Sequence, residues 1–288
     1  MQACPYPGDS RRMDTVDLPN HIQMRVVASD SSSSDDSEDD DSSSDEGDNS
    51  HPTPSDSLGF VPIVLGVVAS LTCVGTVSWG CVHPRIDCRV SWPTLSDAAR
   101  FRPQQTLFAV GVLLTSLLWV TTVLLLHWHS RLQPDTSRNR VLSSAILLCG
   151  LASSMCLLAL GFTDTRAHYA DHRSATVGFF LTIWATAGCI CALRRRRLTP
   201  PPRSITRVAE GATATGILCL AFHSLASLCV NKVWPNSFSV SLSQMALSEY
   251  AVVASLVVFV ATLQHELALL TPLVEAKYFV LLRRAKGK

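Results

Sequence analysis

Long apolar stretches separated by short polar ones fill the chain from residue 58 to residue 264. A helix of about 20 residues rises about 30 Å, which is the thickness of the hydrocarbon core of a bilayer. Each apolar stretch has about this length. The pattern therefore predicts an all-α fold, a polytopic membrane bundle of six transmembrane helices, at residues 58–80, 106–126, 141–162, 174–193, 211–230 and 244–264.

Small residues recur within four of these predicted helices, for example in "LLCGLASS" and "ATAGC". In lipid, two leucines gain little by leaving acyl chains for each other, whereas small residues let two helix backbones approach closely. We therefore expect helices to pack through these stretches.

Residues 1–57 have a different character. Asp30–Ser50 alone holds ten acidic residues and nine serines in 21 positions. Such a segment lacks the apolar surface that would offset the entropy lost on ordering. We predict a disordered acidic N-terminal tail at 1–57, a six-helix transmembrane domain at 58–270 and a basic tail at 271–288.

Basic residues set the expected orientation, because membrane flanks rich in Lys and Arg stay in the cytosol. The segments after the second, fourth and sixth predicted helices hold 14 Lys and Arg, against 7 in the segments on the other side. Both termini are therefore expected in the cytosol. The bilayer is the expected partner, with anionic lipids at Arg194–Arg197 as a further one and no role for nucleic acid.

Two ionisable residues lie inside predicted spans, Glu249 in the last helix and His223 in the helix before it. Both lie within about 10 Å of the same end of the bundle. A charge that faces lipid costs about 3 kcal/mol or more, so such groups usually face the interior and pair. We predict a polar intramembrane pocket formed by Glu249, His223, Tyr250 and Ser248. The alternative is that Glu249 reaches the interface and His223 bonds a carbonyl.

The cysteines predict covalent links rather than a metal site. Cys88 lies in the first predicted lumenal loop, which we expect to be ordered and non-helical because of its prolines. A free thiol is unusual in an oxidising lumen, so Cys88 should pair with Cys81 or Cys229, and we favour Cys229. Cys189 and Cys191 are candidate palmitoylation sites near the cytosolic face. Their C-x-C spacing has no second pair, so no metal is expected, and no motif indicates a cofactor.

A short motif occurs in the C-terminal tail, "YFVL" from Tyr278 to Leu281. A tyrosine followed two residues later by a bulky apolar residue is the form that endosomal sorting adaptors read. Because the tail is expected in the cytosol, this motif predicts sorting adaptors as partners.

Two segments resemble the superfamily of the damage-regulated autophagy modulators. "WPTLSDAARFRP" is similar to their first lumenal loop, with Pro93, Ser96, Asp97 and Pro103 at the matching positions. "LSEYAVVASLVVFVATLQHELALL" is similar to their last helix, which opens with Glu249 and Tyr250 here. His172 matches a histidine before their fourth helix, but Arg173 stands where relatives commonly have an acid.

The resemblance covers roughly residues 58–275 and implies a non-enzymatic regulator of autophagy in lysosomal or late endosomal membranes. "DCRV" at 87–90 is instead similar to the related GPI-anchor remodelling factors. This implies an alternative role, in remodelling the lipid of GPI anchors in the Golgi. The superfamily also includes regulators of phosphatidylinositol 4-kinase, so a regulator of phosphoinositide synthesis at the plasma membrane is a third possibility.

Overall fold

The computed structural model describes residues 58–133, 137–163, 168–196, 201–237 and 239–274. Within these ranges the chain is helical and contains no strand. The helices are α1 (Phe60–Val82), α2 (Leu95–Ala98), α3 (Gln104–Leu132), α4 (Ser137–Phe162), α5 (Tyr169–Arg196), α6 (Arg203–Val230), α7 (Leu242–Ala261) and α8 (Gln264–Ala268). The acidic segment 1–57 and most of the basic tail lie outside the described residues.

Six helical segments are long and apolar enough to cross a membrane, the last of them running from Leu242 to Val274 through α7 and α8. The predicted all-α bundle of six transmembrane helices is therefore confirmed. The observed helices α3 to α6 extend beyond the predicted ranges. Apolar patterning marks only the part of a helix inside the hydrocarbon, whereas the backbone hydrogen bonds continue into the polar flanks.

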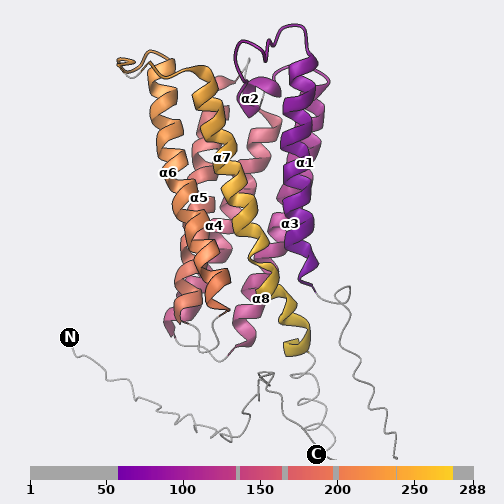
Figure 1. Ribbon diagram of the computed structural model, residues 1–288. Helices are drawn as coiled ribbons and strands as arrows, with labels where there is room; N and C mark the ends of the chain where they lie inside the picture. The colour runs from indigo at the N-terminus through magenta and orange to yellow at the C-terminus, as the bar shows by residue number, and fades with distance from the viewer. Residues whose placement is uncertain (1–57, 134–136, 164–167, 197–200, 238, 275–288) are drawn as a thin grey trace, which may run out of the picture. The chain divides into compact units, whose positions relative to one another are not determined.

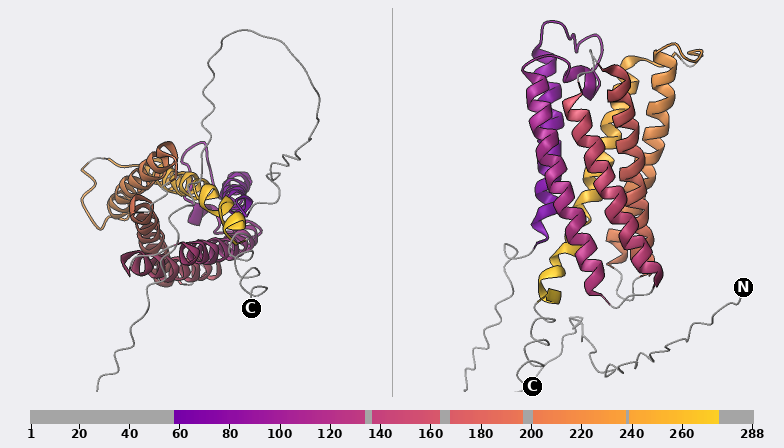
Figure 2. Two further views of the ribbon diagram at one scale, coloured as in Figure 1. Left: turned by 90° about the horizontal axis from the view of Figure 1, so that it is seen from below. Right: turned by 180° about the vertical axis from the view of Figure 1, so that it is seen from behind.

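The six long helices form a closed ring of neighbours, in the order α1, α3, α4, α5, α6, α7 and back to α1 (Figure 1). The view along the bundle in Figure 2 shows the same order. Large buried side chains fill much of the interior, among them Trp119, Val123, Phe180, Trp184 and Phe259. Helix α2 lies at one end of the bundle, called here the α2 end, and α8 lies towards the opposite end.

The segment between α1 and α3 contains the short helix α2, so the prediction that it is entirely non-helical is wrong. Thr94 caps this single turn, because its Oγ1 accepts a hydrogen bond from the backbone N–H of Asp97 at 3.1 Å. The Thr94 hydroxyl in turn donates to the Asp97 carboxylate at 2.8 Å. This reciprocal pair holds one helical turn directly after Pro93.

Cys88 forms a disulfide with Cys81, and Cys229 is a buried free thiol. The favoured pairing of Cys88 with Cys229 is therefore wrong, and the alternative partner is the observed one. The reason is local. Cys81 lies in the last turn of α1, and two backbone turns, closed by the amides of Ile86 and Val90, return the chain to it.

The small residues of the two quoted stretches behave differently. A Cβ atom at Gly150, in α4, would lie 2.6 Å from the side chain of Val123 in α3. A Cβ at Gly188, in α5, would meet nothing within 4 Å. The expected close packing through small residues is thus present at Gly150 and absent at Gly188.

We expect Gly150→Ala to lower the free energy of unfolding by about 1–3 kcal/mol, because α3 or α4 must shift to admit the methyl group. Gly188→Ala should leave stability unchanged or slightly raised, because alanine favours the helix and the space is open. Denaturant unfolding in detergent compares the two variants. Equal effects at both positions would contradict the close approach of α3 and α4 at Gly150.

Candidate functional site

The α2 segment is attached to α7 by hydrogen bonds between residues about 150 positions apart. The backbone N–H of Leu95 donates to the Glu249 carboxylate, Oε2, at 2.9 Å. The Tyr250 hydroxyl donates to the carbonyl oxygen of Pro93. A third bond between the same two segments runs from the Trp92 amide to Ser243 Oγ at 3.1 Å. We call this set of contacts the α2–α7 clamp.

The clamp follows from the chemistry of both sides. The first N–H groups of a helix have no acceptor within that helix, and Leu95 is the first residue of α2. Glu249 lies in α7 and is only 8% exposed, so its carboxylate also needs a donor. One bond satisfies both needs, which explains how an acidic side chain is held within a membrane-spanning helix.

His223 has other partners. Its Nδ1 lies 3.0 Å from the carbonyl oxygen of Met245 and 3.3 Å from Ser248 Oγ, which joins α6 to α7. His223 therefore bonds a carbonyl, as the alternative interpretation expected, but Glu249 is buried rather than at the interface. The structure brings His223 and Ser248 together, whereas the hydrogen bond of Glu249 goes to α2.

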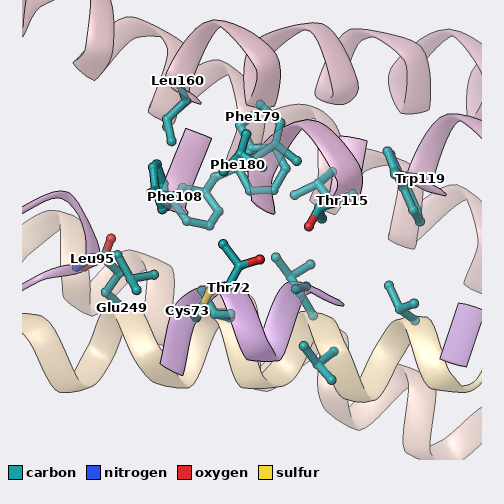
Figure 3. A pocket seen from close by; sticks show the side chains of 18 of the residues that line it. Thr72, Cys73, Leu95, Phe108, Thr115, Trp119, Leu160, Phe179, Phe180 and Glu249 are labelled. Carbon is teal, nitrogen blue, oxygen red and sulfur yellow. The ribbon is translucent and has the colours of Figure 1, made fainter. Parts of the chain in front are cut away.

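Beneath the clamp lies an apolar cavity of about 150 Å³ (Figure 3). Its wall comes from six helices, α1 to α5 and α7, and includes Phe108, Trp119, Phe180 and Cys73. Glu249 and Leu95 border it at the α2 end, where their side chains lie close together in Figure 3. We call this hollow the apolar cavity.

A second, more polar hollow of about 580 Å³ adjoins it, lined from the α2 segment, α5, α6 and α7. We call it the polar groove. Of the four residues of the predicted polar pocket, Glu249 and His223 line it and Ser248 and Tyr250 do not; Ser224 and Ser227 are also in its wall. Tyr250 lies elsewhere, in the wall of a hollow between α1 and α7.

The loop motif meets α5 through one side-chain pair. Ser96 Oγ lies 3.0 Å from Nε2 of His172, and Nδ1 of that histidine lies 3.4 Å from Thr163 Oγ1. His172 is 6% exposed. Asp97 takes no part, because it bonds Thr94, and Pro103 precedes the first residue of α3. A serine hydroxyl beside an imidazole is an arrangement that can move a proton.

The two candidate palmitoylation cysteines differ in exposure. Cys191 is buried in the helix core, with its sulfur 3.9 Å from the Thr213 hydroxyl. Cys189 is partly exposed. Because a palmitoyl transfer needs an accessible thiol, only Cys189 remains a candidate. The sorting motif Tyr278–Leu281 lies outside the described residues.

A buried ion pair between α5 and α8 was missed by the sequence analysis. Arg194 is 1% exposed and donates to both oxygens of the Glu266 carboxylate and to Thr262. The prediction that Arg194 belongs to a basic cluster that binds anionic lipid is therefore wrong. Arg195, the next residue, has its side chain 68% exposed and bonds Glu210 at 2.7 Å. The sequence does contain a signal for this ion pair. Glu266 is an acid directly before the apolar segment "LALL", and an acid in that position needs a partner.

No group of three or more His, Cys, Asp or Glu side chains that could hold a metal ion occurs within the described ranges. At the α2 end, described polar side chains form the clamp, the Ser96–His172 pair and part of the groove wall.

Comparison with known proteins gives one match. No curated protein and no solved structure matches the chain. The family profile described as "Frag1/DRAM/Sfk1/Cwh43P N-terminal domain" matches residues 57–270, which include all six membrane-spanning segments up to α8. The chain therefore belongs to the Frag1/DRAM/Sfk1/Cwh43P family of membrane proteins.

Proposed function

We propose that this protein is a non-enzymatic regulator of autophagy and lysosomal membrane function in an endomembrane, with both termini in the cytosol. The observation that carries the proposal is the α2–α7 clamp. The two motifs that resemble the autophagy modulators, around Pro93–Asp97 and at Glu249–Tyr250, bind each other through the clamp. The two matching motifs are therefore parts of one structural feature, the contact between the α2 segment and α7.

The hydrogen-bond partners of Glu249 and His223 support a structural role for these two side chains. The Glu249 carboxylate accepts a backbone amide, and His223 bonds a backbone carbonyl and Ser248. A side chain whose hydrogen bonds are made within the fold is held in place. In the proposed orientation the clamp presents the 83–103 loop to the lumen as a fixed surface.

The test is microscopy of the full chain with a C-terminal fluorescent tag, scored against lysosomal, Golgi and plasma-membrane markers. We expect a lysosomal signal that moves to the cell surface in Tyr278→Ala, because that change removes the tyrosine of the sorting motif. Tyr169→Ala, outside the tail, is the matched control. A Golgi signal that is indifferent to Tyr278 would overturn the proposal.

A second candidate function, lipid remodelling of GPI anchors, is favoured by the Ser96–His172 pair. Ser96 lines both the apolar cavity and the polar groove, and His172 lines the groove, so an acyl chain and a polar group could meet a nucleophile and a base there.

For this second candidate we expect Ser96→Ala to lower surface retention of GPI-anchored proteins at least tenfold in cells that depend on this chain, because the change removes the nucleophile that His172 would activate. Thr163→Val, which removes the weaker partner of His172, should retain more activity. Full retention with Ser96→Ala would exclude a catalytic serine.

A further inference from the structure

The apolar cavity and the polar groove meet along a shared border. Ser96, Thr176, Phe180 and Glu249 line both hollows. A single molecule could therefore extend from one into the other if one of its ends were apolar and the other polar. In a membrane protein, the abundant molecules with this form are the bilayer lipids.

The cavity suits a hydrocarbon chain. Its wall is almost entirely apolar, and a cavity of about 150 Å³ lined by such side chains stays dry and accepts a molecule of the size of benzene. A chain segment of comparable size therefore fits. Water gains too few hydrogen bonds there to compete with a chain.

The groove opens towards the bilayer between α5 and α6. These two helices pack more loosely on each other than α4 packs on α5 or α6 on α7. Val177 and Leu181 line the groove and are 51% and 65% exposed, so they face lipid. A lipid with two chains could leave its second chain along this side of the bundle while the first enters the cavity.

The groove also carries two cationic side chains, Arg100 and Arg173. No carboxylate of the described residues pairs with either guanidinium. The nearby acids have other partners, since Asp97 bonds Thr94 and Glu249 bonds the Leu95 amide. Guanidinium groups bind phosphate through paired, charge-assisted hydrogen bonds. The two arginines therefore give the groove a positive charge that an anionic head group can use.

We propose that the polar groove and the apolar cavity form one binding site for an anionic glycerophospholipid. The phosphate lies in the groove between Arg100 and Arg173, and one acyl chain passes Ser96 and Phe180 into the cavity. This inference goes beyond the proposed function and does not depend on it, because a regulator and a remodelling factor could both use such a site.

The test uses the full chain in nanodiscs of phosphatidylcholine that contain a few per cent of phosphatidic acid with a diazirine at the end of one acyl chain. After irradiation, labelled peptides are identified by mass spectrometry. We expect labels on cavity-lining residues of α3 and α5, such as Trp119 and Ile183. Ala69→Phe, which fills the cavity, should lower this labelling at least fivefold. Leu71→Phe is the matched control, because Leu71 is on the same helix and 67% exposed.

The head group is tested separately. Arg100→Gln combined with Arg173→Gln should lower cavity labelling at least threefold, whereas Arg102→Gln, outside the groove, should not. A diazirine diacylglycerol with the same chains should label the cavity at least threefold less than phosphatidic acid, and free inorganic phosphate should not compete with the lipid.

Several outcomes would overturn the proposal. Labels confined to outward-facing residues, or equal labelling in Ala69→Phe and Leu71→Phe, would exclude a chain in the cavity. Equal labelling by diacylglycerol, or loss of labelling with inorganic phosphate alone, would exclude recognition of a phospholipid head. If Ala69→Phe lowers the unfolding midpoint, two further measurements test whether a chain occupies the cavity. The smaller change Ala69→Val and competition by unlabelled phosphatidic acid should each lower the labelling of cavity residues.

Discussion

Arg194→Met is expected to lower the free energy of unfolding by about 3–5 kcal/mol, a larger effect than that of Gly150→Ala or Glu249→Leu. The change leaves the Glu266 carboxylate buried without its partner, and breaking a buried ion pair on one side costs about this much. Thr262 also loses its bonds to the guanidinium at the joint between α7 and α8. Denaturant unfolding in detergent measures the effect.

The double variant Arg194→Met with Glu266→Leu should recover most of the lost stability, because an apolar pair of similar volume replaces a buried charge pair at little cost. Arg195→Met is the matched control. Its side chain is 68% exposed, so water screens the pair with Glu210 and the change should have little effect on stability. If Arg194→Met and Arg195→Met cost the same, Arg194 does not form a buried ion pair.

Glu249→Leu is expected to lower stability by about 1–3 kcal/mol, because the Leu95 amide loses its acceptor and the clamp opens. Glu249→Gln should have a smaller effect, since a side-chain carbonyl can still accept that hydrogen bond. Unfolding in detergent ranks the variants.

Glu210→Gln is the control for this series, because Glu210 bonds an exposed arginine. Its effect should be the smallest of the three. Stability that is equally reduced by Glu210→Gln and Glu249→Leu would show that the acceptor on α7 has no special role. Tyr250 and Pro93 would then hold α2 without it.

The sequence predicts the six membrane-spanning helices well, because a run of apolar residues and the bilayer thickness together fix each span. It predicts their ends less well. Polar flanks such as Arg203–Glu210 continue a helix outside the hydrocarbon, and apolar patterning gives no signal there. The single turn of α2 depends on Thr94 and Asp97 capping each other, which the prolines of the loop obscure.

Residue types in the candidate site were recognisable, but most of their partners were not. An acid or histidine within an apolar span must have a partner, and burial of Glu249 and bonding of His223 follow from this rule. Which partner it has depends on tertiary packing. Leu95 contributes only a backbone N–H, and a backbone group carries no side-chain signal in a sequence. Arg194 was masked by the three arginines that follow it.

Hydrogen exchange at the backbone amide of Leu95 tests the clamp most directly, because that amide donates to Glu249. The full chain is compared in nanodiscs with Glu249→Leu, and exchange is followed in the peptide that contains residues 92–101. The clamp predicts slow exchange in the unmodified chain and at least tenfold faster exchange in the variant, with no change at the start of α4. Equal exchange rates in the two proteins would mean that Glu249 does not hold α2.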